Sequence, residues 1–441
     1  MTLSSMFKST LLQVGFLLGF LSMSVTLMAH PLKPASRQVK PVVIENATIH
    51  LVSAPPIDPA SILFNDGKIV AVGRDLVLPS DVERIDGTNL GVYPGLFCAG
   101  GQLGLVEINS VRATRDAQEV GEINSNAKVE VAINPDSELI PVTRANGVLL
   151  TLTTPTGGLI SGTSAVLQLD GWTWEDMVLR APAALHVRWP KMIIPPNRVT
   201  VEEGALSPEK IRDQELQKLA DFFDEARHYH QSTPDRVDLK LEAMRAVFDR
   251  TVPVVVRANT IAQIQAAVAF AAERDVKVVI EGGFDAPFCA PLLLEHDVPV
   301  IVSAVYRLPR RRFDPYDSAY TLARRLYEKG VRFCISGVDR FGASNLRNLP
   351  YHAATAVAFG LPRDEALKAI TLYPAQILGV DDRLGSLDVG HDATLILTDG
   401  DPLETTTHVR EAFLQGRRLD LSNRHHALWK KYRQKYGRSA D

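Results

Sequence analysis

The sequence predicts an α/β protein in which a (β/α)8 barrel of the TIM type is joined to a small β-sandwich built from both ends of the chain. Between residues 93 and 383, short apolar runs typical of buried strands alternate with amphipathic helical segments, which is the repeat of a parallel sheet that closes into a barrel. At the two chain ends, residues 41–92 and 384–420, short alternating runs are separated by turn residues instead. That pattern favours antiparallel strands.

The composition is that of an ordinary globular protein. The chain has 441 residues, with 48 Lys and Arg against 51 Asp and Glu, and 46% of its residues are hydrophobic. Such a chain buries a core large enough to fold unaided and does not belong to the disordered classes. A net charge of -3 also provides no domain-wide basic surface for nucleic acid.

Residues 1–29 have the layout of a secretory signal peptide. Lys8 precedes an apolar run without charges, residues 11–29. Cleavage after Ala29 and retention as an N-terminal membrane anchor both stay open, because Leu27 occupies a position where a small residue is preferred. No later run is apolar for long enough to span a bilayer. We therefore expect a periplasmic or secreted protein.

A polar linker, residues 31–40, leads into the antiparallel part of the chain. There, Asn65, Asp66 and Gly67 separate two alternating runs and predict a hairpin turn. The late runs match the early ones in character, so residues 41–92 plus 384–420 are expected to form one composite unit. Residues 421–441 are a basic C-terminal helix or tail.

The central part of the chain, residues 93–383, supplies the barrel. Its amphipathic helices include residues 261–275, 318–330 and 362–379. Eight strands are expected, at residues 92–100, 148–154, 160–169, 183–189, 252–258, 277–283, 298–305 and 331–337.

Three cysteines, Cys98, Cys289 and Cys334, lie in apolar segments. An odd number in such surroundings indicates buried thiols more than a disulfide framework. A single bridge stays open.

Several motifs resemble the amidohydrolase superfamily, in particular its imidazolonepropionase-like members. The chain opens with IENATIHLV, NDGKIVAVG and VYPGL and closes with LGSLDVGHDATLILTDGDPL, while ALKAITLYPAQILG and NPDSELIPVTRANGV lie between them in the family's order. The resemblance covers nearly all of residues 42–420. It implies a barrel whose site, at the C-terminal ends of the strands, uses a divalent metal such as zinc to hydrolyse carbon–nitrogen bonds of cyclic amides.

The metal-ligand motifs of that family are degenerate in this chain. Its first-strand His-x-His is replaced by Gly100 and Gln102, and the histidines expected on the fifth and sixth strands are replaced by Arg257 and Glu281. The last-strand aspartate has a candidate counterpart in Asp339, although the motif can be aligned in two ways.

The remaining metal candidates are Asp339, Glu281 and His186, a poor set for zinc, which prefers nitrogen and sulfur donors. The family's fourth-strand lysine has no counterpart within the strand, although Lys191 follows it closely. No metal ligand is therefore assigned, and the cofactor stays open.

Arginines follow several of the predicted strands. Arg257 ends the fifth, Arg307 and residues 310–312 follow the seventh, and Arg340 follows the eighth. Because arginine captures carboxylate or phosphate in a bidentate fashion, these side chains and Gln102 predict a site for an anionic small molecule. A structural network, with the arginines paired to nearby carboxylates such as Asp314, is the equal alternative.

Two functions follow from these residues. The first is an exported amidohydrolase-like hydrolase that cuts a non-peptide carbon–nitrogen bond, using either a rebuilt metal site or metal-free acid–base chemistry by Asp339 and Glu281. The second is a catalytically inactive, metal-free pseudoenzyme that binds a ligand or docks a partner. No nucleic acid and no membrane contact beyond the N-terminal segment are expected, and a homo-oligomer is left open.

Overall fold

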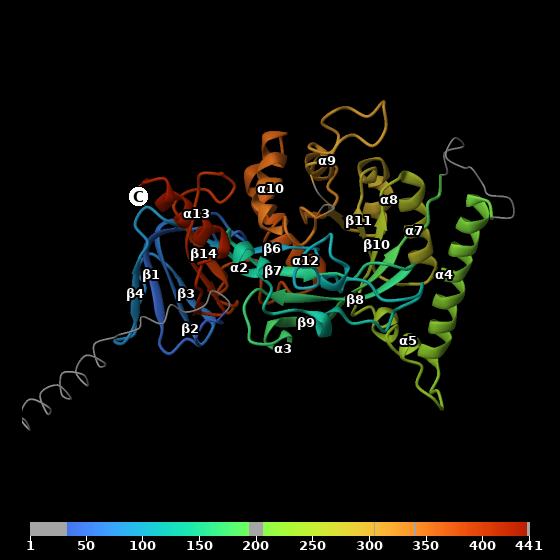
Figure 1. The fold of residues 1–441 in the computed structure, drawn as a ribbon, viewed down its shortest axis with the longest axis horizontal. Helices are drawn as coiled ribbons and strands as arrows, with labels where there is room; N and C mark the ends of the chain where they lie inside the picture. Colours follow the sequence, from blue (N-terminus) through green and yellow to red (C-terminus); the bar gives the residue numbers. More distant parts are fainter. Residues whose placement is uncertain (1–32, 194–205, 304, 339–340, 439–441) are drawn as a thin grey trace, which may run out of the picture.

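The computed structural model describes residues 33–193, 206–303, 305–338 and 341–438, and it contains two separate eight-stranded sheets (Figure 1). The predicted signal peptide or anchor, residues 1–29, lies outside the described residues. None of the helices within the described ranges is long and apolar enough to cross a membrane.

The larger sheet forms a nearly closed barrel of the TIM type. Its strands follow one another in chain order, and all eight predicted strands are present. They are β6 (Leu96–Cys98), β7 (Val148–Thr153), β8 (Ile160–Gln168), β9 (Val178–Arg188), β10 (Val254–Ala258), β11 (Val278–Gly282), β12 (Val300–Val302) and β13 (Phe333–Ile335).

The prediction of eight parallel strands is wrong for one of them. Strand β8 runs antiparallel to both β7 and β9, whereas the other neighbouring strands are parallel. The connection between β7 and β8, residues 154–159, is too short for a crossover between parallel strands. Gly157 and Gly158, both at positive φ, turn the chain back there.

Strands β13 and β6 close the barrel indirectly. The backbone N–H groups of Ile335 and Phe97 donate to the carbonyl oxygens of Ala369 and Ile370, at 2.9 and 2.7 Å. The thiol of Cys98 also donates to the carbonyl of Ser336 at 2.8 Å. A short segment therefore bridges the last and first strands.

The helix predicted over residues 362–379 is two helices, α11 (Arg363–Lys368) and α12 (Leu372–Leu378). Their junction includes Ala369 and Ile370, whose carbonyls bind the strands, and Pro374 in the first turn of α12 has no N–H to continue a helical ladder. Of the other predicted helices, residues 261–275 form α7 (Ile261–Glu273), and residues 318–330 contain the shorter helix α9 (Leu322–Glu328).

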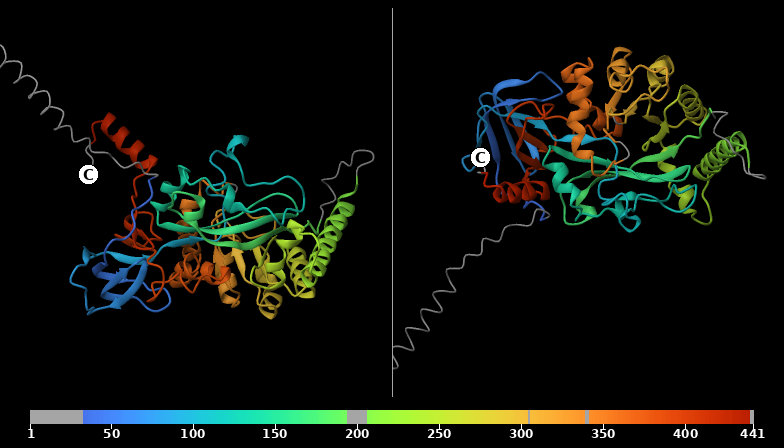
Figure 2. Two further views of the ribbon diagram at one scale, coloured as in Figure 1. Left: turned by 90° about the horizontal axis from the view of Figure 1, so that it is seen from below. Right: turned by 45° about the horizontal axis from the view of Figure 1, so that its top comes forward.

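Most of the remaining helices surround the barrel, whereas α13, which has no buried residue, lies at the end of the molecule that carries the second sheet (Figures 1 and 2). These remaining helices are α2 (Leu139–Arg144), α3 (Trp174–Met177), α4 (Pro208–Gln231), α5 (Leu239–Glu242), α6 (Arg245–Phe248), α8 (Ala290–Glu295), α10 (Leu349–Ala358) and α13 (Arg424–Lys435).

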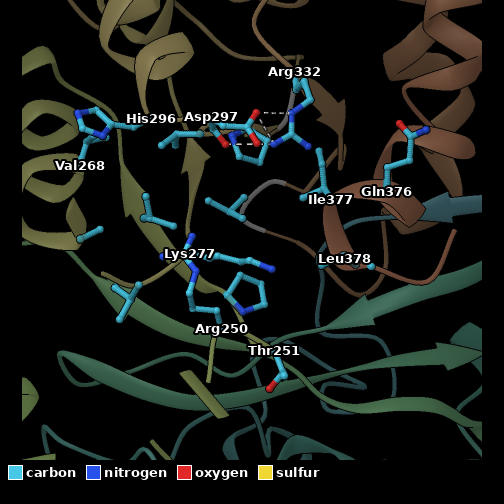
Figure 3. A pocket seen from close by; sticks show the side chains of 18 of the residues that line it. Arg250, Thr251, Val268, Lys277, His296, Asp297, Arg332, Gln376, Ile377 and Leu378 are labelled. Atoms are coloured by element: carbon cyan, nitrogen blue, oxygen red, sulfur yellow. Dashed lines mark hydrogen bonds and ion pairs between the residues drawn. The ribbon is translucent and has the colours of Figure 1, made fainter. Parts of the chain in front are cut away.

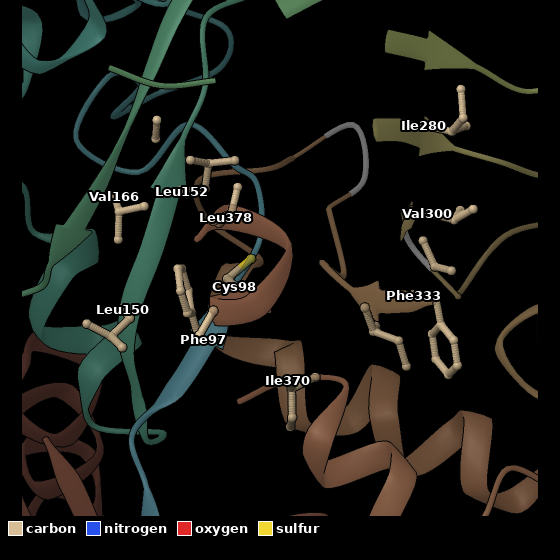
Figure 4. Packing of buried hydrophobic residues seen from close by; sticks show 14 of the residues in the cluster. Phe97, Cys98, Leu150, Leu152, Val166, Ile280, Val300, Phe333, Ile370 and Leu378 are labelled. Carbon is tan, nitrogen blue, oxygen red and sulfur yellow. The ribbon is translucent and has the colours of Figure 1, made fainter. Parts of the chain in front are cut away.

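The period of two along each barrel strand separates an outer from an inner layer. Ile280, Val300 and Phe333 pack in the large outer cluster (Figure 4), whereas Val279 and Cys334, one residue along, belong to a small inner cluster. The inner cluster comprises Ala99, Ala184, Val255, Val279, Ile301 and Cys334. Residues two positions before or after these therefore point toward the two ends of the barrel.

The second sheet combines strands from both ends of the chain, as the sequence predicts. Its order is β16-β15-β14-β5-β1-β2-β3, with β4 beside β1. The strands are β1 (Val42–Ile49), β2 (Ile57–Asn65), β3 (Lys68–Gly73), β4 (Glu83–Asp86), β5 (Gly91–Pro94), β14 (Leu395–Thr398), β15 (Val409–Leu414) and β16 (Arg417–Arg418).

This sheet curls around a core of its own. The rings of Phe64 on β2 and Phe413 on β15 are 5.1 Å apart, although three strands separate β2 from β15 in the sheet. The predicted hairpin joins β2 to β3, and its turn residues Asp66 and Gly67 both have positive φ. Such angles match the primed turns that suit two-residue hairpins.

All three cysteines are buried free thiols, as predicted. Burial raises the pKa of the Cys289 thiol to about 11, and burial also raises the pKa values of Cys98 and Cys334. Because thiolate is the reactive form, we expect a thiol reagent at pH 8 to leave the native protein unmodified and to label three thiols after denaturation. Rapid labelling of the native protein would contradict this burial.

Candidate functional site

Three neighbouring strands bring polar side chains together at the C-terminal mouth of the barrel. His186 lies on β9, Arg257 on β10 and Glu281 on β11, and each is two residues beyond an inner-cluster residue of its strand. Together they line a small cavity of about 40 Å³. The location is that of the active site in TIM-barrel enzymes.

Arg257 and Glu281 form a two-point ion pair. They are direct neighbours in the register of β10 and β11, and Nε and Nη2 of Arg257 donate to Oε2 and Oε1 of Glu281 at 3.2 and 3.3 Å. Half of the arginine side chain, 51%, stays exposed, against 14% of the glutamate. The guanidinium is therefore held in place while one side remains open to a ligand.

Electrostatics keep this carboxylate ionised. Burial alone raises the pKa of Glu281, but the charge of Arg257, together with His186 and the hydrogen bonds from Arg257, outweighs burial and holds the pKa below its ordinary value. The Glu281 charge in turn raises the pKa of Arg257. A glutamate in this state is a firm anchor for Arg257 and a weak base.

His186 is a buried, neutral imidazole. Burial lowers its pKa to about 4; the Glu281 charge opposes this shift and the Arg257 charge reinforces it. Its Nε2 atom has no hydrogen-bond partner among the described residues. A buried ring nitrogen without a partner carries a desolvation cost, which a bound ligand or water can relieve.

Of the other predicted site residues, those that the structure describes do not line this cavity. Gln102 is half-buried, and its backbone carbonyl accepts from Leu105 and Val106 in a turn after β6. Lys191 is exposed. Asp339 and Arg340 lie outside the described residues.

The arginines after β12 divide into two kinds. Arg311 is structural, because its guanidinium pairs with Asp285 at 2.6 Å and with Asp314 at 2.9 Å. Arg307 instead lies 5.0 Å from the Phe284 ring centroid, and its Nε and Nη2 have no hydrogen-bond partner within the described part of the chain. Burial and the like charge of Arg310 lower the pKa of Arg307 to about 10, so an anion there would be stabilised.

The pairing of Arg257 with Glu281 was not predicted from the sequence. A signal for it exists, since both residues are fourth in short apolar runs, VVVRA and VVIEG, that form consecutive parallel strands. Equal offsets in adjacent strands place side chains side by side when the register is unshifted.

The described residues at the mouth do not by themselves fit a divalent metal. His186 and Glu281 offer two donors, but the Arg257 guanidinium binds both oxygens of Glu281 and would repel a second cation. No group of three or more His, Cys, Asp or Glu side chains within the described ranges is arranged to hold a metal ion.

Comparison with known proteins agrees with the motifs noted above. A model of the amidohydrolase family matches residues 292–418. Imidazolonepropionase from Syntrophobacter fumaroxidans is 34% identical over 104 residues, 23% of this chain and 23% of that protein. Amidohydrolase tasK from Hapsidospora irregularis is 39% identical over 90 residues, 20% of this chain and 9% of that protein. The chain thus spans less than a quarter of the length of these curated relatives.

The fold itself is shared over almost the whole described chain. An amidohydrolase structure from Thermotoga maritima superposes with a TM-score of 0.76 at 23% identity, covering 86% of this chain and 99% of that one. The family match extends from the last barrel strands into the second sheet, where the closing motifs lie. These findings together support the assignment of the chain to the amidohydrolase superfamily.

Proposed function

We propose that this protein is an exported hydrolase, periplasmic or secreted, that cuts a non-peptide carbon–nitrogen bond of an anionic small molecule at the barrel mouth. The observation that carries the proposal is the unpartnered Nε2 of neutral His186 beside the ion pair of Arg257 and Glu281. Superfamily membership supplies the reaction class, since its named relatives include hydrolases of carbon–nitrogen bonds.

The chemistry follows from the roles that each group can take. The exposed side of Arg257 binds the substrate carbonyl oxygen and stabilises the negative charge that forms on it. Water attacks the carbonyl carbon while His186 Nε2 takes its proton, and the resulting imidazolium faces the Glu281 carboxylate. The carbon–nitrogen bond then breaks, and the imidazolium returns the proton to the departing nitrogen. Asp339 is the predicted second acid–base group.

A negative charge on the substrate would activate the site. The Arg257 charge lowers the pKa of His186, so an anion that neutralises this charge raises that pKa and makes the imidazole a stronger base. Arg307, with two donors free of partners in the described residues, offers a further contact for the anion. Binding and proton acceptance are thereby coupled.

This coupling predicts the titration of His186. By NMR, one of the 11 histidines should titrate near pH 4 in the free protein, and the pKa of this residue should rise when an anion occupies the mouth. A His186→Asn variant assigns the signal. Titration of every histidine near pH 6.5 would contradict the burial.

The same shifts give the sign of the stability change with pH. An unfolded chain protonates His186 at its ordinary pKa of 6.5, whereas the folded chain does so near 4. The stabilising contribution of the neutral ring is therefore complete above pH 6.5 and is lost as the pH falls toward 4. The lowered pKa of Glu281 acts in the same direction, below its ordinary value of 4.5.

The proposal is tested with carboxylate-bearing cyclic amides and their methyl esters, with metal content measured on the same preparation. We expect hydrolysis of the carboxylates, slower hydrolysis of the esters, loss of turnover in His186→Asn, and metal far below one equivalent per chain. No turnover of any cyclic amide, or turnover that requires a stoichiometric metal, would overturn it.

A second candidate, a binding module without catalysis, is favoured by one observation. Both His186 and Glu281 have pKa values well below neutrality, which makes both weak bases in the free protein. Binding of carboxylates that depends on Arg257, without any hydrolysis, would establish this function instead.

A further inference from the structure

A second cavity lies at the opposite end of the barrel, where the strands begin (Figure 3). Its volume is about 900 Å³, and it is lined by residues that precede β10 to β13 and by the C-terminal end of α12. Lys277 and Arg332 lie two residues before Val279 and Cys334 of the inner cluster. Both therefore extend from the inner face of the barrel toward this end.

The middle layer of the barrel interior, which borders this cavity, has short side chains. TIM barrels fill their interior with layers of side chains. Here the middle layer consists of Ala, Val, Ile and Cys residues. Pro253 and Pro299, which precede the two strands on either side of β11, lie in the layer below it together with Lys277 and Arg332. Ile377 of α12 packs against the middle layer from below and forms part of an apolar wall.

Positive charge exceeds negative charge among the lining residues. Arg250 pairs with Asp275, and Arg332 pairs with Asp297 at 2.8 Å. The other two cations are Arg180 and Lys277, and no ion pair is formed by either within the described residues.

Arg180 is held in a fixed orientation by backbone groups. Its guanidinium donates to the carbonyls of Leu378 at 3.1 Å and Thr251 at 2.8 Å, and also to Gly379. Gly379 has a φ of +63°, and a Cβ there would lie 2.9 Å from Arg180 Nη1, so this glycine makes room for the arginine. The carbonyls orient the charge but do not neutralise it.

We propose that this cavity binds a small organic dianion, either a phosphate monoester or a dicarboxylate. Lys277 and Arg180 supply two positive charges without carboxylate partners, and Arg332 borders the same space (Figure 3). Apolar side chains in the cavity wall strengthen that potential at a bound ligand. Val298 and Ile377 contact its carbon skeleton. The site is independent of the barrel mouth and of the reaction proposed there.

Calorimetric titration of the full chain with phenyl phosphate and with phthalate tests the assignment. Lys277→Met is expected to weaken binding by about tenfold or more, because a charge-assisted contact is lost. Asp297→Asn is expected to strengthen binding, because it frees Arg332 from its carboxylate. Lys430→Met, which removes an exposed lysine of α13, is the matched control and should leave binding unchanged.

The outcomes separate the two sites and the two ligand classes. The proposal is supported if one or both probes bind, if binding changes in Lys277→Met and Asp297→Asn, and if it persists in Arg257→Gln. The probe that binds then shows which class of anion the cavity takes. Absence of binding at millimolar concentrations overturns the proposal. The proposal is also overturned if Lys430→Met weakens binding as much as Lys277→Met does, or if binding is lost in Arg257→Gln. It is likewise overturned if light scattering shows a dimer that Lys277→Met converts to a monomer.

Discussion

Replacing Arg257 with glutamine is expected to reduce turnover and ligand binding more than any other single change at the barrel mouth. The guanidinium is the group placed to bind the carbonyl oxygen, and loss of one donor to a developing oxyanion costs about 100- to 1,000-fold in rate. Steady-state kinetics with a carboxylate-bearing cyclic amide measure this loss. If the protein only binds ligands, calorimetry should show the loss as weaker affinity.

Because Arg257 forms an ion pair with Glu281, its replacement changes stability as well as activity, and a double variant separates the two effects. Arg257→Gln leaves the Glu281 carboxylate, 14% exposed, without its partner, so the variant should also be less stable and the pKa of Glu281 should rise. In the double variant Arg257→Gln/Glu281→Gln no unpaired charge remains, so stability should recover while activity does not.

An arginine pair elsewhere serves as the matched control. Arg84 on β4 pairs with Glu45 on the adjacent parallel strand β1, far from the mouth, in the second sheet. Arg84→Gln should leave turnover and ligand binding unchanged. If Arg257→Gln also left both unchanged, Arg257 would be a structural residue, and the alternative of a salt-bridge network would hold for it.

Replacing Asp170 with asparagine is expected to give the largest loss of stability. Its carboxylate accepts from Arg144 at 2.8 Å, from Arg417 at 2.7 Å and from the backbone N–H of Ala35 at 3.1 Å. The side chains of Asp170 and Arg144 are only 2% and 3% exposed. This cluster joins the barrel to strand β16 of the second sheet.

Removing that carboxylate leaves two arginines at a buried site without their shared counter-charge. Breaking a buried ion pair in this way costs about 3–5 kcal/mol in the free energy of unfolding. Urea unfolding at pH 7 measures the change. The matched control is Asp81→Asn, since Asp81 pairs with Lys40 at 3.6 Å and is 87% exposed, and its expected effect is below about 1 kcal/mol.

A small effect of Asp170→Asn would mean that the two sheets are held together by apolar packing alone. If the Asp170→Asn variant unfolds in two steps, with one sheet unfolding before the other, then the cluster at the junction makes the two sheets unfold together in the unaltered protein.

The sequence by itself determined the features that depend on local patterns. Short apolar runs located all eight barrel strands, because a strand buried on both faces is apolar over most of its length. Asn65, Asp66 and Gly67 located the hairpin, because only residues that tolerate positive φ fit its turn. The apolar surroundings of the cysteines likewise predicted buried thiols.

Only the tertiary structure decided the direction of strand β8, which arginines pair with carboxylates, and which titratable groups are desolvated. The apolar run of β8 has the same composition whether the strand runs parallel or antiparallel, and the division of residues 362–379 into two helices follows from carbonyls that bind distant strands. Arg307 and Arg311 are close in sequence, yet only Arg311 meets carboxylates. The charge of Arg257, the neutrality of His186 and the cavity around Lys277 depend on neighbours far along the chain, and the burial that shifts their energetics exists only once the barrel has closed.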